Sequence, residues 1–176
     1  MGSLKRVKNN KKILNTLQTT YEFRKPYQII FEEEFLKKIN KSKLTVNYFY
    51  KLFFSSPKFF ITECSYKIYK SKNLNFENDF SKYCEIRKCG HTNLNTEECL
   101  SDILKKNNKF HYFVATTNQK LKNTLSNLFF VPFIHLENNT LILESLRKNT
   151  NFKDNTLVIT EISSDKNITN ENVLIK

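Results

Sequence analysis

The stretch HYFVATTNQKLKNTLSNLFFVPFIHLE, residues 111–137, decides the fold class. It places two short apolar runs, 111–116 and 131–137, on either side of a polar segment with helical character. Apolar runs of strand length that alternate with helical segments are typical of parallel strands covered by helices. The end of the first run, TTN at 116–118, offers an N-cap for the helix. We therefore expect a strand, a helix and a second, parallel strand here.

The same alternation extends toward the N-terminus. Apolar runs of strand length occur at 27–32 and 58–63, and one more, 140–146, follows the opening stretch. Segments with helical character are 10–22, 32–39, 45–54, 65–71, 76–86 and 97–106. The predicted fold class is α/β, with a central parallel sheet flanked by helices on both faces. Sites in such sheets form at the carboxyl ends of strands, which directs attention to Glu32, Cys64, Asn118 and Glu137.

Length and charge limit the classes of protein to consider. A chain of 176 residues suits one domain. No apolar run approaches the ~18 residues of a membrane span, and the basic N-terminus lacks the apolar core of a signal peptide. We therefore expect a soluble, intracellular protein that has no membrane partner. Its four cysteines are then more plausible as thiols or metal ligands than as disulfides.

The net charge of +12 is unevenly distributed. Residues 1–25 carry seven basic side chains and one acid, as expected for a basic arm that binds nucleic acid. The alternative is an ordinary solvated run of charge. We divide the chain into a basic N-terminal arm or helix (1–25), a main domain (26–147) and a polar C-terminal tail (148–176). The tail has the composition of a partner-binding segment that orders on docking.

Soft metal ligands gather in the segment 83–99. Cys89, His91 and Cys99 follow the pattern C-x-H-x7-C, and Gly90 allows a tight turn between the first two. A fourth ligand could be Cys64 or Cys84, and spacing alone leaves these two open. A closed set of four Cys and His ligands would make a structural zinc site, within an insert at about 84–100. The alternative is a buried cysteine cluster beside a surface histidine.

Several segments of the chain resemble a known family in their order and spacing. They are KRVKNNKKIL (5–14), EFRKPYQIIFEEEFL (22–36), FFITECSYKIY (59–69), RKCGH (87–91), EEC (97–99), YFVATTNQKLKNTL (112–125) and VPFIHLENNTLILESL (131–146). Over about residues 4–147 the chain resembles the PIN-domain proteins of the small-subunit processome. The resemblance is closest to their degenerate, U3-snoRNA-associated branch. It implies a Rossmann-like PIN fold with an inserted CCHC zinc site, in which Cys64 joins Cys89, His91 and Cys99 and Cys84 does not.

The resemblance also implies that the nuclease site has decayed. Active PIN domains hold divalent cations with several carboxylates at the strand ends. The matching positions here are Glu32, Ile68, Asn118 and Lys120, so only the first remains acidic. We therefore expect no enzyme activity. The alternative is that another acid, Glu33, Glu34, Glu63 or Glu137, has moved into the site.

The resemblance, the basic side chains and the incomplete nuclease site together predict an RNA-binding assembly factor in early processing of the 18S-type ribosomal RNA precursor. The residues expected to contact RNA are Lys5, Arg6, Lys8, Lys11, Lys12, Arg24, Lys25, Arg87, Lys88, Lys120 and Lys122. The resemblance implies as partners the pre-ribosomal RNA, a small nucleolar RNA of the box H/ACA kind and processome proteins, with a nucleolar location in the nucleus and no small-molecule substrate. Two alternatives are an active metal-dependent endoribonuclease and a zinc-stabilised protein-interaction module.

Overall fold

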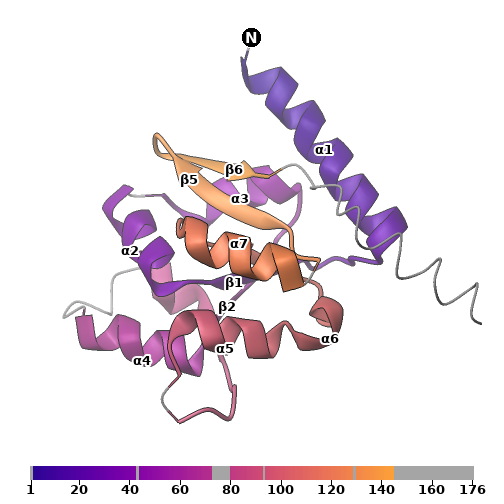
Figure 1. Ribbon diagram of the computed structural model, residues 1–176. Helices are drawn as coiled ribbons and strands as arrows, with labels where there is room; N and C mark the ends of the chain where they lie inside the picture. Colours follow the sequence, from indigo (N-terminus) through magenta and orange to yellow (C-terminus); the bar gives the residue numbers. More distant parts are fainter. Residues whose placement is uncertain (1, 43, 73–79, 93, 129, 145–176) are drawn as a thin grey trace, which may run out of the picture. The chain divides into compact units, whose positions relative to one another are not determined.

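The computed structural model describes residues 2–42, 44–72, 80–92, 94–128 and 130–144 (Figure 1). Chain contacts divide the protein into two units, Met1–Ser145 and Leu146–Lys176. The second unit lies outside the described residues, and so does the predicted tail 148–176. The helices and strands of the first unit, in chain order, are α1 (Gly2–Tyr21), β1 (Gln28–Phe31), α2 (Glu33–Ser42), α3 (Val46–Phe53), β2 (Lys58–Thr62), α4 (Glu63–Lys72), the 3-10 turn η1 (Phe80–Tyr83), β3 (Cys84–Arg87), α5 (Thr96–Ile103), α6 (Lys105–Asn108), β4 (Tyr112–Ala115), α7 (Gln119–Leu128), β5 (Phe133–Glu137) and β6 (Thr140–Leu143).

The strands form one six-stranded sheet in the order β3-β2-β1-β4-β5-β6. The first five strands in this order are parallel, and β6 pairs antiparallel with β5 at one edge. The α/β class and the parallel-dominated sheet are therefore confirmed. Because β1 lies between β2 and β4 and all three are parallel, the residues that follow these strands lie close together at the carboxyl ends of the strands.

Helices cover both faces of the sheet, as continuous apolar strands require (Figure 1). On one face, Leu100 of α5 and Leu121 of α7 join Ile30 and Val114 of the sheet in a buried cluster. On the opposite face the core is aromatic, and it is built by the rings of Phe31, Phe35, Phe49, Phe59 and Phe80. Successive side chains of a strand alternate between these two cores.

Helix α1 is longer than the predicted helix over 10–22, and it includes most of the predicted basic arm (1–25). Its C-terminal half buries Ile13, Leu14 and Leu17. Near the end of the helix, the ring of Tyr21 stacks on Phe130 at 3.8 Å between centroids. The N-terminal half is polar, and Leu4 is 73% exposed. The arm is therefore exposed over the N-terminal half of α1, whereas the C-terminal half of this helix packs on the domain.

Strand β3 was not predicted, and the helix expected over 76–86 is wrong in its described part. Residues 80–83 form a 3-10 turn and 84–87 an edge strand paired with β2, while 73–79 lie outside the described residues. The missing signal is explained by composition and burial, because no residue of β3 is fully buried and its sequence CEIR is half polar. Cys84 is thus a half-buried strand residue rather than part of a helix.

Within the described part of the chain, no helix has the length and apolar character to cross a membrane.

Candidate metal centre and polar strand ends

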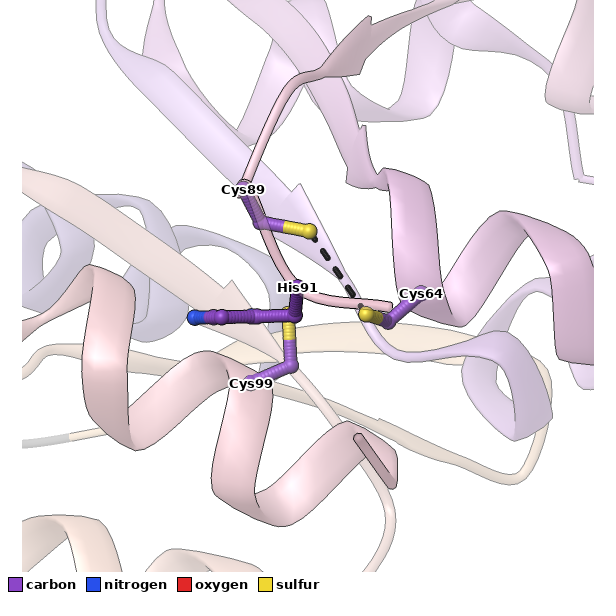
Figure 2. Close-up of side chains that lie close together, drawn as sticks. All are labelled: Cys64, Cys89, His91 and Cys99. Carbon is purple, nitrogen blue, oxygen red and sulfur yellow. Dashed lines mark hydrogen bonds between the residues drawn. The ribbon is translucent and has the colours of Figure 1, made fainter. Parts of the chain in front are cut away.

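The register of β2 and β3 places Cys64 beside Cys89. Thr62 pairs with Arg87 in this parallel pair, and each cysteine follows two residues later. The segments that follow the two strands leave the sheet side by side, so the Sγ atoms of the cysteines lie 3.5 Å apart (Figure 2). Cys64 lies in the first turn of α4 and Cys89 in the loop after β3. The unpredicted strand is therefore what brings residues 25 apart in sequence together.

His91 and Cys99 complete the group. One ligand atom from each of Cys64, Cys89, His91 and Cys99 can be chosen so that all four lie within 4.8 Å of one another (Figure 2). Gly90 has a φ of +70°, which an L side chain adopts at a cost, and it turns the chain so that both of its neighbours face the group. Among the described residues this is the one cluster of three or more Cys, His, Asp or Glu side chains able to hold a metal ion.

The hydrogen bonds of His91 leave one ring nitrogen for a metal ion. Its Nε2 lies 2.8 Å from Oδ2 of Asp102 on α5, whereas its Nδ1 is buried and has no hydrogen-bond partner among the described residues. A buried polar atom without a partner is costly. Metal-bound histidines commonly donate their second ring N–H to a carboxylate. The donor set fits an ion held by three sulfur atoms and the Nδ1 of His91.

The three thiols lie in different electrostatic surroundings. Burial raises the pKa of Cys99 to about 12 and also raises that of Cys64. Burial acts in the same direction on Cys89, but hydrogen bonds from the backbone of His91 and Cys64 outweigh it and lower the pKa of Cys89 to about 7. Three thiolates packed this closely repel one another, so a bound cation is what would allow all three to lose their protons. Cys64 and Cys99 also lie in the first turns of α4 and α5, where the helix dipole favours negative charge.

A chain of buried hydroxyl groups lies beside the cysteines. The hydroxyl of Thr62 donates to Ser65 at 2.9 Å, Ser65 donates to Thr96 at 3.3 Å, and Thr96 donates to the carboxylate of Glu33. These residues come from four different elements, so the chain of hydroxyls joins β2, α4, α5 and α2. Glu33 is 8% exposed, and its carboxylate is held at the start of α5 by the hydrogen bond from Thr96.

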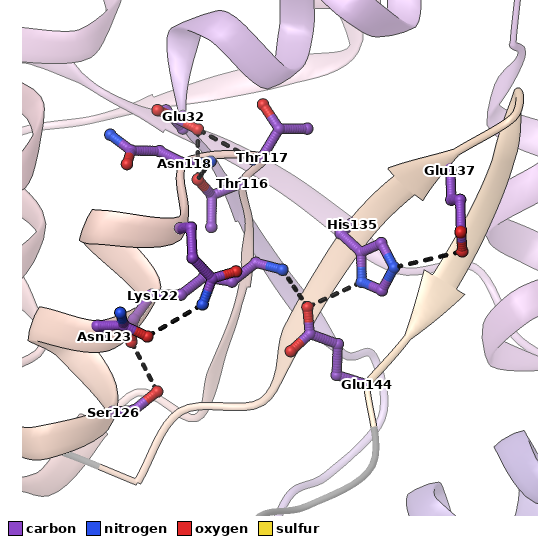
Figure 3. A network of polar contacts seen from close by, with 11 residues as sticks. Glu32, Thr116, Thr117, Asn118, Lys122, Asn123, Ser126, His135, Glu137 and Glu144 are labelled. Carbon is purple, nitrogen blue, oxygen red and sulfur yellow. Dashed lines mark hydrogen bonds and ion pairs between the residues drawn. The ribbon is translucent and has the colours of Figure 1, made fainter.

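Glu32 occupies the end of the central strand β1. It is 4% exposed, and Oε2 accepts hydrogen bonds from the hydroxyl of Thr116 and, at 3.3 Å, from the backbone N–H of Thr117 (Figure 3). Burial raises the pKa of Glu32, although both hydrogen bonds act in the opposite direction. The carboxylate is thus bound to the end of β4 next to Asn118.

The three other positions implied by the resemblance carry no carboxylate. Asn118 accepts a hydrogen bond from the N–H of Leu121 at 3.2 Å and so caps α7, as the TTN motif predicts. Lys120 is exposed in the first turn of α7. Ile68 is half-buried on α4.

Glu97, which was not predicted as a site residue, is an acid near the first turn of α7. Its Oε2 lies 4.0 Å from Nζ of Lys120, and its Oε1 accepts a hydrogen bond from Thr124 at 3.0 Å. Glu97 lies in the first turn of α5, whose start reaches the same edge of the sheet as α7. The two glutamates at the start of α5, Glu97 and Glu98, were visible in the sequence. Because β3 was not predicted, their position relative to the strand ends could not be assigned.

The predicted RNA-contacting residues differ in their exposure. Those on α1 and before β1, together with Lys88 and Lys120, are exposed, and Arg87 is half-buried with its guanidinium 4.7 Å from the ring centre of Phe110. Lys122 is 7% exposed, and its ammonium pairs with Glu144, which also contacts His135 Nδ1 at 2.8 Å (Figure 3). Lys122 therefore presents no free ammonium to a phosphate, and we omit it from the proposed RNA-binding surface.

A solved structure described as the PIN domain endonuclease Utp24 superposes on the chain with a TM-score of 0.60 and 17% sequence identity. The match covers 69% of this chain and 93% of that one. At this identity the match shows the fold alone, which is that of a PIN domain. The fold expected from the sequence resemblance is confirmed.

Sequence comparison identifies the family to which the chain belongs. Residues 51–145 match the Fcf1 family. The rRNA-processing protein utp23 of Schizosaccharomyces pombe is 33% identical over 153 residues, which is 83% of this chain. The chain spans 59% of the length of that relative. This chain belongs to the Fcf1 family.

Proposed function

We propose that the chain is a non-cleaving, RNA-binding PIN-domain protein that acts in ribosomal RNA processing. The name of the fission yeast relative supports a place in that process. In finer terms, the proposal is an assembly factor of the small-subunit processome in early 18S-type maturation. It would act in the nucleolus, with pre-ribosomal RNA, a box H/ACA small nucleolar RNA and processome proteins as partners. The proposed domain limits are those of the sequence analysis, with 1–25 as the basic arm and 148–176 as a partner-binding tail.

The observation that carries this proposal is the chemistry of the strand ends. A two-metal nuclease needs several carboxylates around one space. Here Glu32 is held by Thr116, Asn118 caps a helix, and the Nζ of Lys120 lies 4.0 Å from Glu97. An ammonium ion near a carboxylate competes with a divalent cation for it. Basic side chains, by contrast, are exposed along α1, where they could neutralise phosphates.

We propose further that the Cys64, Cys89, His91 and Cys99 group holds zinc as a structural ion. Three sulfur atoms and one imidazole form a ligand set that zinc prefers. Four protein ligands leave no open position for water, so the ion would stabilise the fold and not activate a substrate. Cys64 would fix the start of α4, Cys89 and His91 the loop after β3, and Cys99 the start of α5.

The alternative function, an active endoribonuclease, is favoured by one observation. Glu32, Glu33 and Glu97 all lie at or just beyond the carboxyl edge of the sheet, so acidic groups are not absent there. Each of them, however, is engaged by a hydroxyl group or a lysine.

A single experiment separates the two functions. The full chain is incubated with end-labelled single-stranded RNA and either Mg²⁺ or Mn²⁺, and binding and cleavage are followed together. We expect salt-dependent binding without metal-dependent products. Cleavage that is lost in Glu32→Gln would establish the nuclease instead. No binding at low salt would contradict both the assembly-factor proposal and an RNA role for α1.

A further inference from the structure

A groove of about 680 Å³ runs between helix α4 and edge strand β3. Residues of α4 that line it include Glu63, Tyr66, Lys67 and Lys70, whose spacing of three and four places them on one helical face. Ile86 and Lys88 line the opposite wall, two residues apart, as expected for neighbours on one side of a strand. We call this feature the α4–β3 groove. Its volume lies within the range of ligand pockets, roughly 300–1,000 Å³.

The α4–β3 groove is lined by both apolar and basic side chains. Ile86 is 47% exposed, which is high for an isoleucine beside a helix, and Tyr66 adds an aromatic ring. Three lysines line the groove against one glutamate, and the carboxylate of Glu63 lies 3.6 Å from Nζ of Lys67. No ion pair of Lys70 or Lys88 occurs among the described residues.

The candidate metal centre anchors both walls of the groove. Cys64 directly follows Glu63, and Cys89 directly follows Lys88. Because the Sγ atoms of these cysteines lie 3.5 Å apart, the first turn of α4 and the exit of β3 are fixed together at that end (Figure 2). A groove whose walls are held in place loses little conformational entropy when a ligand binds.

We infer that the α4–β3 groove binds unpaired RNA, with the lysines contacting phosphates and a base packing on Tyr66 and Ile86. This inference rests on the proposed function and adds a second RNA-binding surface to it, distinct from α1. Single-stranded RNA combines the two properties that the groove complements, which are repeated negative charge and flat, largely apolar bases. An acidic peptide would supply the charge, but it does not otherwise account for an RNA-processing relative or for the surplus of +12 on the whole chain.

The test measures binding of a fluorescent 12-nucleotide uridine RNA to the full chain, by anisotropy at several salt concentrations. The groove variant is Lys67→Ala/Lys70→Ala. The control, Lys58→Ala/Lys109→Ala, removes the same charge from exposed positions near the amino ends of β2 and β4. The slope of log K against log salt should become shallower in the groove variant, by about 0.7 for each phosphate that the protein no longer neutralises, and should remain unchanged in the control.

Tyr66 provides an independent check on the packing of a base. Tyr66→Ala should weaken binding about ten-fold, and Tyr66→Phe should keep it, because stacking needs the ring and not the hydroxyl. If wild-type chain binds RNA while the lysine and tyrosine variants bind equally well, the groove inference fails and the proposed function survives. If wild-type chain binds no RNA, both fail. If a glutamate-rich peptide binds instead, and Lys67→Ala/Lys70→Ala abolishes that binding, the groove belongs to a protein partner and the inference is wrong.

Discussion

The Nε2 atom of His91 lies 2.8 Å from Oδ2 of Asp102, and this contact orients the opposite ring nitrogen toward three cysteines. Asp102 is held in turn by the ammonium of Lys105. That hydrogen bond and the one from His91 keep the pKa of Asp102 below its ordinary value. The carboxylate thus fixes which nitrogen of His91 is available to a metal ion.

Replacing Asp102 should weaken metal binding without removing a ligand. We expect Asp102→Ala to lower zinc affinity about 10- to 100-fold, because His91 loses the partner that fixes its tautomer and ring orientation. Competition with a chromophoric chelator measures the affinity. Lys105→Ala is the control, since its side chain is 67% exposed and contacts the histidine only through Asp102. Equal zinc affinity in Asp102→Ala and wild type would show that the carboxylate has no positioning role.

Loss of the metal ion should destabilise the domain strongly. In Cys99→Ser, a buried ligand is removed from α5, and loss of a structural metal is among the few changes that cost more than about 4 kcal/mol. Thermal unfolding with and without chelator isolates the metal-dependent part. Chelation should lower the melting temperature of wild type and leave Cys99→Ser unchanged.

Cys84 supplies the matched control, because it is half-buried and lies outside the four-ligand group. Cys84→Ser should keep the full response to chelator. If Cys84→Ser and Cys99→Ser both lost that response, the ligand assignment would have to be revised.

Glu32 should make the domain less stable as pH rises. Because burial raises its pKa above the ordinary 4.5, its contribution to stability is complete below that value and is lost as pH rises through the raised pKa. Gln at this position keeps an oxygen for Thr116 and Thr117 but does not ionise. The free energy of unfolding of Glu32→Gln, relative to wild type, should therefore increase between about pH 4 and pH 7.

Glu34 provides a control of opposite sign. The hydrogen bond from Lys37 lowers the pKa of Glu34, so its contribution is present at neutral pH and is lost on acidification. At neutral pH, Glu34→Gln should therefore be less stable than wild type. In acid, the stabilities of the variant and of wild type should become similar. Denaturant unfolding at a series of pH values measures both trends. If the free energies of unfolding of the two variants, relative to wild type, changed with pH in the same direction, the raised pKa of Glu32 would be refuted.

Removing residues 1–12 should reduce RNA binding and preserve the fold. The truncation removes Lys5, Arg6, Lys8, Lys11 and Lys12 but leaves the buried Ile13, Leu14 and Leu17 in place. We expect weaker binding and a shallower salt dependence, with little change in melting temperature. Leu17→Ala is the converse control: it should cost about 2–5 kcal/mol of stability and leave the charges intact. Unchanged affinity of the truncated chain at low salt would favour a merely solvated run of charge.

The sequence predicted the other five strands of the sheet and missed the edge strand β3. β1, β2 and β4 are largely apolar and buried on both faces, which makes their pattern clear, and β5 and β6 lie within apolar runs that are buried only in part. No residue of β3 is fully buried, and half of its residues are polar, so its composition resembles that of a turn or helix. Without β3, the meeting of Cys64 and Cys89 could be inferred from resemblance but not from geometry.

The candidate site was predictable in its ligand types and not in its surroundings. The spacing of Cys89, His91 and Cys99 indicates metal binding because soft ligands are rare in this chain. Asp102, by contrast, is one of many acids on a helix, and its contact with His91 depends on how α5 packs beside the loop. The burial of Lys122 was missed for the same reason, since its partner Glu144 follows β6, 22 residues later.

X-ray absorption at the zinc edge of the purified full chain tests the central claim most directly. We predict one zinc ion per chain, surrounded by three sulfur atoms at about 2.3 Å and one nitrogen at about 2.0 Å. A metal shell made of oxygen and nitrogen atoms only, or a folded chain that contains no zinc, would contradict the account.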